Sequence, residues 1–254
     1  MTFNPLRQFI GLILVPLTST AAFALDVRTA AQDSQPKFIK SGSTVTGLCV
    51  DVIKAIERAD PDLKFSAITS LTPLPRIEAS LSEGSLDVFC GLAKTKDRES
   101  RFDFIEPPVY STHTVLAARL NETLSPKTFD ELRNLGDDSS VLVVTQTVHA
   151  DVLKAHPGIK VDSEAKDTSA NLKKLLAGRG RFVFHNDFAL ADEIKRENLG
   201  DKVKLLPAQF MSEGRYFVVS KMASPALKEK LRVAMDKLNK TGELTKMFQS
   251  YKPK

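Results

Sequence analysis

LSEGSLDVFCGLAKTKDRESRFDFIEPPVY spans residues 81–110 and joins an apolar run to a strongly charged turn. Residues 86–92 are short and mostly apolar, which predicts a buried strand. Residues 95–101 carry five charged side chains, and Thr95 is a residue type that commonly begins a helix. In α/β proteins, ligands bind at the carboxyl ends of the strands. We therefore expect this strand end to face a functional cleft.

Strand-like and helix-like patterns alternate on both sides of this stretch. The order of strands and helices predicts an α/β fold, in which a largely parallel sheet is covered by helices. The pattern restarts after residue 120, which predicts two α/β units with a cleft between them. Strands are expected at residues 27–31, 64–68, 86–92, 141–145, 159–161, 181–185 and 216–220, and helices at 48–56, 73–84, 129–135, 148–155, 170–177 and 225–238.

The amino-terminal 24 residues have the pattern of a cleavable secretory signal. Arg7 precedes an apolar run over residues 9–17, and residues 22–24 read Ala-Phe-Ala. A charged start, a short apolar segment and an A-x-A end are typical of such leaders. A membrane anchor is the weaker interpretation, because Pro16 and residues 18–20 interrupt the apolar run. We expect export of a soluble chain that begins near Leu25.

The two cysteines, Cys49 and Cys90, both lie in the expected mature chain. In an oxidising compartment, an even pair of cysteines favours a disulfide. The alternative is a pair of buried thiols. Neither a metal site nor a cofactor is expected, because two cysteines and four scattered histidines have no metal-ligand spacing. His149 and His185 are expected near the cleft, with structural roles as the default.

Charge and motifs exclude several classes of protein. The net charge is +5, and loss of Arg7 with the leader leaves about +4, with basic and acidic residues interleaved. Such mixing indicates a solvated surface and not a nucleic-acid footprint. Neither a G-x-S-x-G nucleophile motif nor a Walker-type phosphate loop is present in the sequence.

Four motifs in order resemble one protein family. They are GLCVDVIKAI at residues 47–56, the opening stretch, LLAGRGRFVFHND at 175–187 and RYFVVSKMASPALKEKLRVAMDKLNKTGELTKMFQSY at 215–251. Together they resemble the periplasmic solute-binding proteins of amino-acid ABC transporters, the bacterial extracellular solute-binding proteins of family 3. The resemblance implies the two-lobe, type 2 periplasmic-binding-protein fold. Lobe 1 would comprise residues 25–116 and 216–254, lobe 2 residues 117–215, with crossovers at 117–120 and 211–215.

The resemblance also implies roles for residues of the opening stretch. Thr95 and Arg98 match the family's T-x-x-R turn, whose arginine binds the carboxylate of the ligand. A guanidinium can form two parallel hydrogen bonds with a carboxylate, which agrees with this role. Gly91 matches a position where the backbone comes close to the ligand. Ala93 departs from the family, because many members have a threonine hydroxyl there.

Further implied contacts come from the rest of the chain. Asn186 aligns with the acidic residue that holds the ligand's amino group, so that either Asp187 takes this role or the amino group is bound more weakly. An equally weighted alternative is that Asp187 caps the following helix. Thr145 and Thr147 could offer hydroxyls and helix-start N–H groups to an anion.

Two more positions concern the cleft wall. Leu74 stands where an aromatic wall is common in the family. Arg76 lies beside it and is a candidate second anion contact, with a surface role as the alternative.

The function implied by the resemblance is capture of a small carboxylate-bearing solute, an amino acid or a relative, in the periplasm. The partners would be this ligand and an inner-membrane ABC permease, with the protein acting as a monomer and not as an enzyme. One alternative is an enzyme on the same fold, such as a cyclohexadienyl dehydratase, for which Glu106, His185 and Asp187 are candidate acid–base groups. The other alternative is a sensory ligand-binding protein.

Overall fold

The computed structural model describes residues 24–136 and 140–252. The predicted leader lies outside the described residues, apart from Ala24. Within the described ranges, no helix is long and apolar enough to span a membrane. The elements in chain order are β1 (Leu25–Val27), β2 (Ala31–Gln32), β3 (Ile39–Ser41), β4 (Thr44–Thr46), α1 (Leu48–Ala59), β5 (Leu63–Phe65), β6 (Leu71–Thr72), α2 (Leu74–Ser82), β7 (Val88–Ala93), α3 (Lys96–Arg101), β8 (Phe102–Arg119), α4 (Phe129–Arg133), β9 (Val141–Leu142), α5 (Val148–Lys154), β10 (Val161–Asp162), α6 (Thr168–Leu176), β11 (Phe182–Asn186), α7 (Asp187–Arg196), β12 (Val203–Leu205), β13 (Met211–Ser220), α8 (Pro225–Lys240) and α9 (Glu243–Tyr251).

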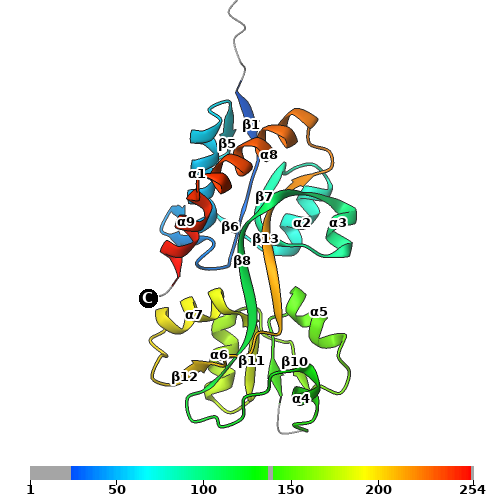
Figure 1. Ribbon diagram of the computed structural model, residues 1–254, viewed down its shortest axis with the longest axis vertical. Helices are drawn as coiled ribbons and strands as arrows, with labels where there is room; N and C mark the ends of the chain where they lie inside the picture. The colour runs from blue at the N-terminus through cyan, green and yellow to red at the C-terminus, as the bar shows by residue number, and fades with distance from the viewer. Residues whose placement is uncertain (1–23, 137–139, 253–254) are drawn as a thin grey trace, which may run out of the picture.

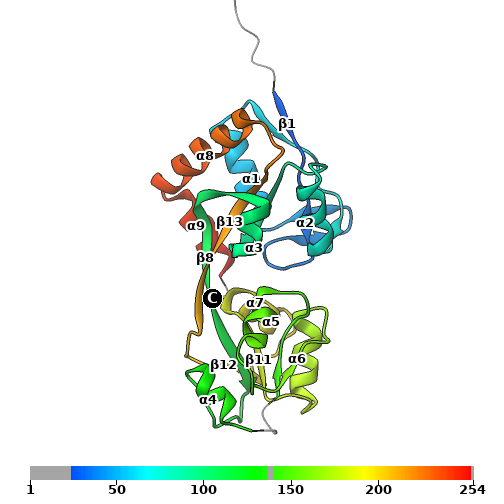
Figure 2. The ribbon, with the colours of Figure 1, turned by 90° about the vertical axis from the view of Figure 1, so that its right-hand side faces the viewer.

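The chain forms two lobes, as the alternating pattern predicted (Figure 1). Lobe 1 contains α1, α2 and α3 together with the returning helices α8 and α9, and lobe 2 contains α4 to α7 (Figures 1 and 2). The two long strands β8 and β13 run through both lobes and connect them. The predicted two-lobe α/β fold is therefore confirmed.

The main sheet is mixed, and not largely parallel as we expected. Its order is β10-β9-β11-β8-β13-β7, with β12 added beside β8. Strands β9, β10 and β11 are mutually parallel, whereas β8 pairs antiparallel with β11, β12 and β13. The difference arises because the chain enters lobe 2 along β8 and returns along β13, so these two strands run in opposite directions.

The first crossing between the lobes lies earlier than residues 117–120. In lobe 1, Ile105 of β8 lies opposite Phe217, and Thr114 already lies opposite Met211. From Thr114 onward β8 pairs with β11, and Ala117 is buried in the lobe 2 core. Between these two parts, residues 110–114 of β8 pair with residues 211–215 of β13, so the two strands pass from one lobe to the other side by side.

Lobe 1 is held by an apolar core and a disulfide. Helix α1 buries Leu48, Val52 and Ile56 along one face. The predicted disulfide is confirmed: Cys49 and Cys90 are bonded, fully buried, and their Cα atoms are 5.8 Å apart. The bond ties the first turn of α1 to the end of β7.

Lobe 2 presents helix starts toward lobe 1. Helices α5, α6 and α7 begin after Thr147, Asp167 and Asn186, whose side chains accept hydrogen bonds from backbone N–H groups of the first turn. Side chains of this kind satisfy donors that a helix start would leave unpaired. Figure 1 shows the ends of α5 and α7 that face lobe 1.

The predicted elements do not include the long strand β8, the helices α3, α7 and α9, or several short strands. The strand expected at residues 27–31 is instead the separate pair β1 and β2, and the hairpin β3–β4 was not predicted. Runs of two or three residues are too short to show a periodic pattern. Helix α9 was also missed; it is separated from α8 by Gly242, which has a φ of 73°.

Glu122 stabilises the turn after β8. Its buried carboxylate accepts hydrogen bonds from the side chain of Arg181, at 2.8 and 3.0 Å, and from the backbone N–H groups of Thr123 and Leu124. These bonds, above all those of Arg181, lower the pKa of Glu122 from 4.5 to about 2. Because the folded state binds the proton more weakly than the unfolded chain, this stabilisation is present above the ordinary pKa and is lost as the pH falls toward 2.

We expect Glu122→Gln to lower the free energy of unfolding at neutral pH by about 3 kcal/mol, the value of the pKa shift. Urea unfolding of both proteins at neutral pH and at about pH 2.5 measures this difference. The difference should shrink at the lower pH, because this carboxyl is protonated in the unfolded chain at that pH and the folded protein is then close to its pKa of about 2. An equal difference at both pH values would contradict the assigned pKa.

Candidate functional site

A cleft of about 970 Å³ lies between the lobes. Its walls come from lobe 1, from the two crossing strands and from lobe 2. The residues used below are Gln32, Lys37, Leu74, Gly91, Ala93 and Arg98 of lobe 1, Tyr110, Thr112 and Arg215 of the crossing strands, and Thr145, Thr147, His149, His185 and Asn186 of lobe 2. The end of β7 contributes to this cleft, as predicted for the opening stretch.

Arg98 lies in the lobe 1 wall with its guanidinium held in place. The residue is 9% exposed. Its Nε and Nη2 atoms donate to Oε1 of Glu78, at 3.1 and 2.8 Å, and its Nη1 donates to the backbone oxygen of Ala93 at 3.1 Å. Three of the five N–H groups of a guanidinium are used by these contacts, which leaves two for a solute in the cleft.

Thr95 and Glu78 prepare this arrangement. Thr95 begins α3, and its hydroxyl accepts a hydrogen bond from the backbone N–H of Arg98 at 3.2 Å. The second oxygen of Glu78 accepts a bond from Arg101 at 2.6 Å, so one carboxylate holds two arginines. Thr95 itself is not among the residues that line the cleft. Thr95 therefore holds the backbone of Arg98 and does not contact the cleft.

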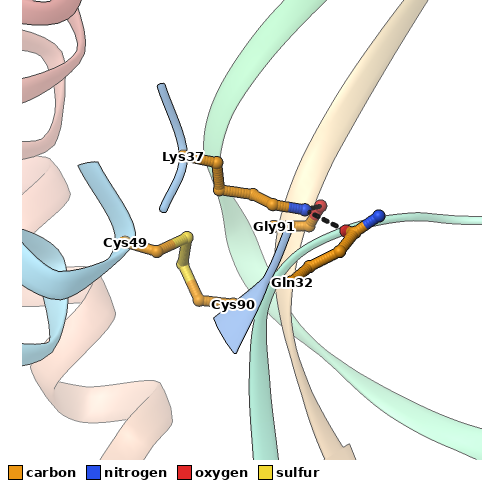
Figure 3. The surroundings of a disulfide bond; sticks show 5 residues. All are labelled: Gln32, Lys37, Cys49, Cys90 and Gly91. Atoms are coloured by element: carbon orange, nitrogen blue, oxygen red, sulfur yellow. Dashed lines mark hydrogen bonds between the residues drawn. A yellow bond between two sulfur atoms is a disulfide. The ribbon is translucent and has the colours of Figure 1, made fainter. Parts of the chain in front are cut away.

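Lys37 is a cleft residue that the sequence analysis missed. It is 7% exposed, and its Nζ donates to Oε1 of Gln32 at 2.6 Å and lies 3.5 Å from the backbone oxygen of Gly91 (Figure 3). The ammonium also lies 5.1 Å from the centre of the Phe89 ring. Burial, together with the charges of Arg215 and Arg98, lowers the Lys37 pKa well below its ordinary value.

The buried position of the Lys37 side chain requires a glycine at residue 91. Its φ is 89°, and a Cβ atom built there would lie 2.5 Å from Cδ of Lys37 and 3.4 Å from Sγ of Cys49. A side chain at this position would therefore displace the lysine or the strand end. The resemblance implied a close approach of the backbone to a ligand, and the structure shows the stem of Lys37 in close approach.

The remaining predicted residues divide between the cleft and its surroundings. Ala93 and Leu74 line the cleft, and Ala93 contributes the backbone oxygen that holds Arg98. Arg76 and Asp187 are not among the lining residues. Asp187 accepts hydrogen bonds from the backbone N–H groups of His113 and Phe188, both to Oδ1.

The lobe 2 wall brings together Thr145, Thr147 and Asn186. The hydroxyl of Thr147 caps α5, and Oδ1 of Asn186 caps α7 by accepting the N–H of Ala189 at 2.8 Å. Asn186, and not Asp187, therefore begins the helix, opposite to the capping alternative that the sequence left open. The side-chain NH₂ of Asn186 lies 2.9 Å from Nδ1 of His185.

Two histidines lie in the lobe 2 wall, with ring centres 4.6 Å apart. Burial lowers the pKa of His149 well below its ordinary value, helped by the charges of His185 and Arg215. Burial and the charges of Arg215 and Lys37 lower the pKa of His185 to about 3. Both rings are therefore neutral at physiological pH. The ring nitrogens of His149 and the hydroxyl of Thr112 are buried without a hydrogen-bond partner in the described part of the chain, and Nε2 of His149 lies 3.9 Å from Oε2 of Glu213.

Comparison with known proteins identifies relatives over nearly the whole chain. The family model described as bacterial extracellular solute-binding proteins, family 3, matches residues 25–254. The probable amino-acid-binding protein YxeM of Bacillus subtilis (strain 168) is 26% identical over 226 residues, which cover 87% of this chain and 81% of that protein.

Solved structures share the fold at low sequence identity. The ligand-binding core of GluR0 in complex with L-glutamate superposes with a TM-score of 0.78 at 18% identity, covering 91% of this chain and 99% of that one. The ancestral amino-acid-binding protein AncCDT-1, a precursor of cyclohexadienyl dehydratase, gives 0.74 at 19% identity, covering 90% and 95%. A mutant of ArgBP from T. maritima gives 0.72 at 21% identity, covering 89% and 94%.

Proposed function

Because the chain belongs to the bacterial extracellular solute-binding proteins of family 3, we propose that it captures a small carboxylate-bearing solute in its interlobe cleft. The solute is an amino acid or a close relative, and the protein delivers it to an inner-membrane ABC permease. In this proposal the protein works as a monomer in the periplasm, after removal of the leader at residues 1–24.

The observation that carries the proposal is the orientation of Arg98. A buried guanidinium is fixed by Glu78 and by the Ala93 oxygen, and two of its N–H groups remain for a solute in the cleft. Charge-assisted, two-pronged hydrogen bonds of arginine to carboxylate are strong and directional. The prior fixation of the side chain lowers the entropy lost on binding.

Closure of the lobes would complete the site. Only β8 and β13 connect the two lobes within the described residues, and both pass the cleft at Tyr110, Thr112 and Arg215. Bending of two such connections is the common way in which two-lobe binding proteins close around a ligand. Lobe 2 would then bring Thr145, the start of α5 and Asn186 to a solute already held by Arg98.

Native mass spectrometry of the exported protein tests the proposal, followed by calorimetry with the solute that is found. We expect one small carboxylic acid or amino acid per chain, with a dissociation constant in the micromolar range or below. A protein that carries no such molecule, and that binds none from a panel of amino acids and small carboxylic acids, would refute the function.

The enzymatic alternative has less support. Among its candidate groups, Glu106 and Asp187 do not line the cleft, and Glu106 instead pairs with Lys94 at 3.1 Å. His185 does line the cleft, but a group with a pKa of about 3 is a weak general base at neutral pH. Turnover of prephenate or arogenate by the purified protein would favour this alternative over capture and release.

A further inference from the structure

Three cations lie around the lobe 1 end of the cleft, and only two of them have carboxylate partners. Arg98 is bound by Glu78, and Arg215 is bound by Glu213. Lys37 contacts the neutral side chain of Gln32 and the backbone oxygen of Gly91 (Figure 3). Within residues 24–136 and 140–252, no carboxylate forms an ion pair with it.

Such a lysine is unfavourable for the unliganded protein. A buried ammonium without a counter-charge loses hydration that neutral acceptors replace only in part. Repulsion from the two neighbouring arginines adds to this cost, as the strongly lowered pKa of Lys37 reflects. The contacts of Lys37 therefore do not explain why a cationic residue occupies this buried position, whereas an anion in the cleft would.

We propose that Lys37 is a ligand-binding residue, and that the captured solute carries two anionic groups, one bound by Arg98 and the other by Lys37. The two cations contact backbone oxygens of residues 91 and 93, two positions apart on β7. Because the two cations are held at different residues, they suit two separate anionic groups, as in a short dicarboxylic acid, better than the two oxygens of one carboxylate.

The acceptors in this part of the cleft disfavour a solute with one carboxylate and one ammonium. Glu78 and Glu213 are bound by arginines, and Oδ1 of Asn186 is used by the start of α7. The Gly91 oxygen faces Lys37.

Among the described residues, four carboxylates line the cleft. Asp167 caps α6, Glu193 pairs with Arg196, Glu197 accepts a hydrogen bond from Ser169, and Asp33 is exposed. An ammonium placed beside Lys37, Arg98 and Arg215 would meet three cations, so a second anionic group is favoured there.

Lobe 2 adds positive potential from the opposite side. Asn186, the neutral residue that begins α7, lines the cleft. The amino-terminal end of a helix carries a partial positive charge. This helix start supplements the anion site that Lys37 and Arg98 define.

The inference rests on the proposed capture function and is tested with three probes of similar size: glutamine, glutamate and glutarate. Calorimetry should show that the wild-type protein binds glutamate or glutarate at least about tenfold more tightly than glutamine, which corresponds to about 1.4 kcal/mol. Glutamate represents an acidic amino acid, and glutarate represents a dicarboxylic acid without an ammonium. The order of their affinities therefore shows which of these two classes the site prefers.

The variant Lys37→Met removes the ammonium and keeps a chain of similar length. We expect this variant to bind the better-bound dicarboxylate at least about tenfold more weakly than the wild type does. Its affinity for glutamine should stay within about twofold of the wild-type value. Lys40→Met is the matched control, because Lys40 lies in the same segment and is exposed. The control should bind all three probes as the wild type does.

Proton uptake gives a second readout. A carboxylate bound beside Lys37 should raise the lowered pKa of this residue, so that dicarboxylate binding takes up a proton and weakens as the pH rises. The charged and titratable groups that act on Lys37 are Arg98, Arg215 and His185. Calorimetry in buffers of different ionisation enthalpy should detect uptake by the wild type and by Lys40→Met, and less by Lys37→Met.

Thermal unfolding separates a binding role from a structural one. Removal of a buried amine that has no carboxylate partner should raise the Tm of unliganded Lys37→Met, whereas loss of a structural lysine would lower it. The inference would be overturned if glutamine bound more tightly than both dicarboxylates. It would also be overturned if Lys37→Met bound the dicarboxylates with the same affinity as the wild-type protein. If a glutamine-like solute is bound in an Arg98-dependent manner, the proposed function stands and only the inference fails.

Discussion

Replacement of Arg98 by alanine should weaken binding of the captured solute at least about tenfold, or about 1.4 kcal/mol. The physical reason is the loss of two charge-assisted hydrogen bonds in a buried position, where water competes poorly for the carboxylate. The measurement is calorimetry with the solute identified by native mass spectrometry. The fold should survive, because Glu78 retains its contact with Arg101.

Arg101→Ala is the matched control for this prediction. Arg101 contacts the same carboxylate at 2.6 Å, but it does not line the cleft. Its removal takes away the same charge and disturbs the same partner without touching the solute. We expect the Arg101 variant to bind within about threefold of the wild type. Equal losses in the two variants would mean that Arg98 acts only through Glu78, and the carboxylate site would have to be abandoned.

The sequence predicts this part of the site well because its determinants are local. The strand that ends near Gly91, the helix start at Thr95 and the inward position of Arg98 all fall within 8 residues. Local patterns of apolar residues and caps are the information that a single sequence carries most clearly. The same holds for the lobe 1 helix after Gly47.

The sequence does not show which distant residues contact one another. Glu78 holds Arg98 from 20 positions away, and Lys37 approaches Gly91 from 54 positions away. A lysine in a polar segment is by default an exposed side chain. Its burial depends on how β2, α1 and β7 come together, which periodicity does not encode. The one local sign is its place between Pro36 and Phe38, both of which are buried.

Asn186 and Asp187 show a related limit. Both residue types cap helices well, so the sequence allowed either to begin α7. The structure begins the helix at Asn186 and turns Asp187 toward His113. A shift of one residue exchanges which side chain lines the cleft, and an amide replaces a carboxylate there. The absence of that carboxylate is part of the case for an anionic solute.

The largest expected effect on stability comes from the disulfide. The bond joins residues separated by 41 positions in the sequence. On the chain-entropy model, a loop of this size contributes about 4 kcal/mol by restricting the unfolded chain. The double replacement of Cys49 and Cys90 by alanine should lower the free energy of unfolding of the oxidised protein by about this amount, as measured in urea. Wild-type protein that is denatured without reduction should not be labelled by an alkylating reagent at either position.

The same bond packs against two cleft residues, Lys37 and Gly91, so its removal tests whether it holds them in position. Sγ of Cys49 would lie 3.4 Å from a Cβ atom at Gly91, and the backbone N–H of Cys49 donates to the Lys37 oxygen at 3.1 Å. The disulfide therefore packs where Lys37 crosses β7. If it only restricts the unfolded chain, the alanine variant should bind the solute within about threefold of the wild type while its unfolding free energy falls. A parallel loss of affinity, greater for dicarboxylates than for glutamine, would instead show that the bond positions the ammonium of Lys37.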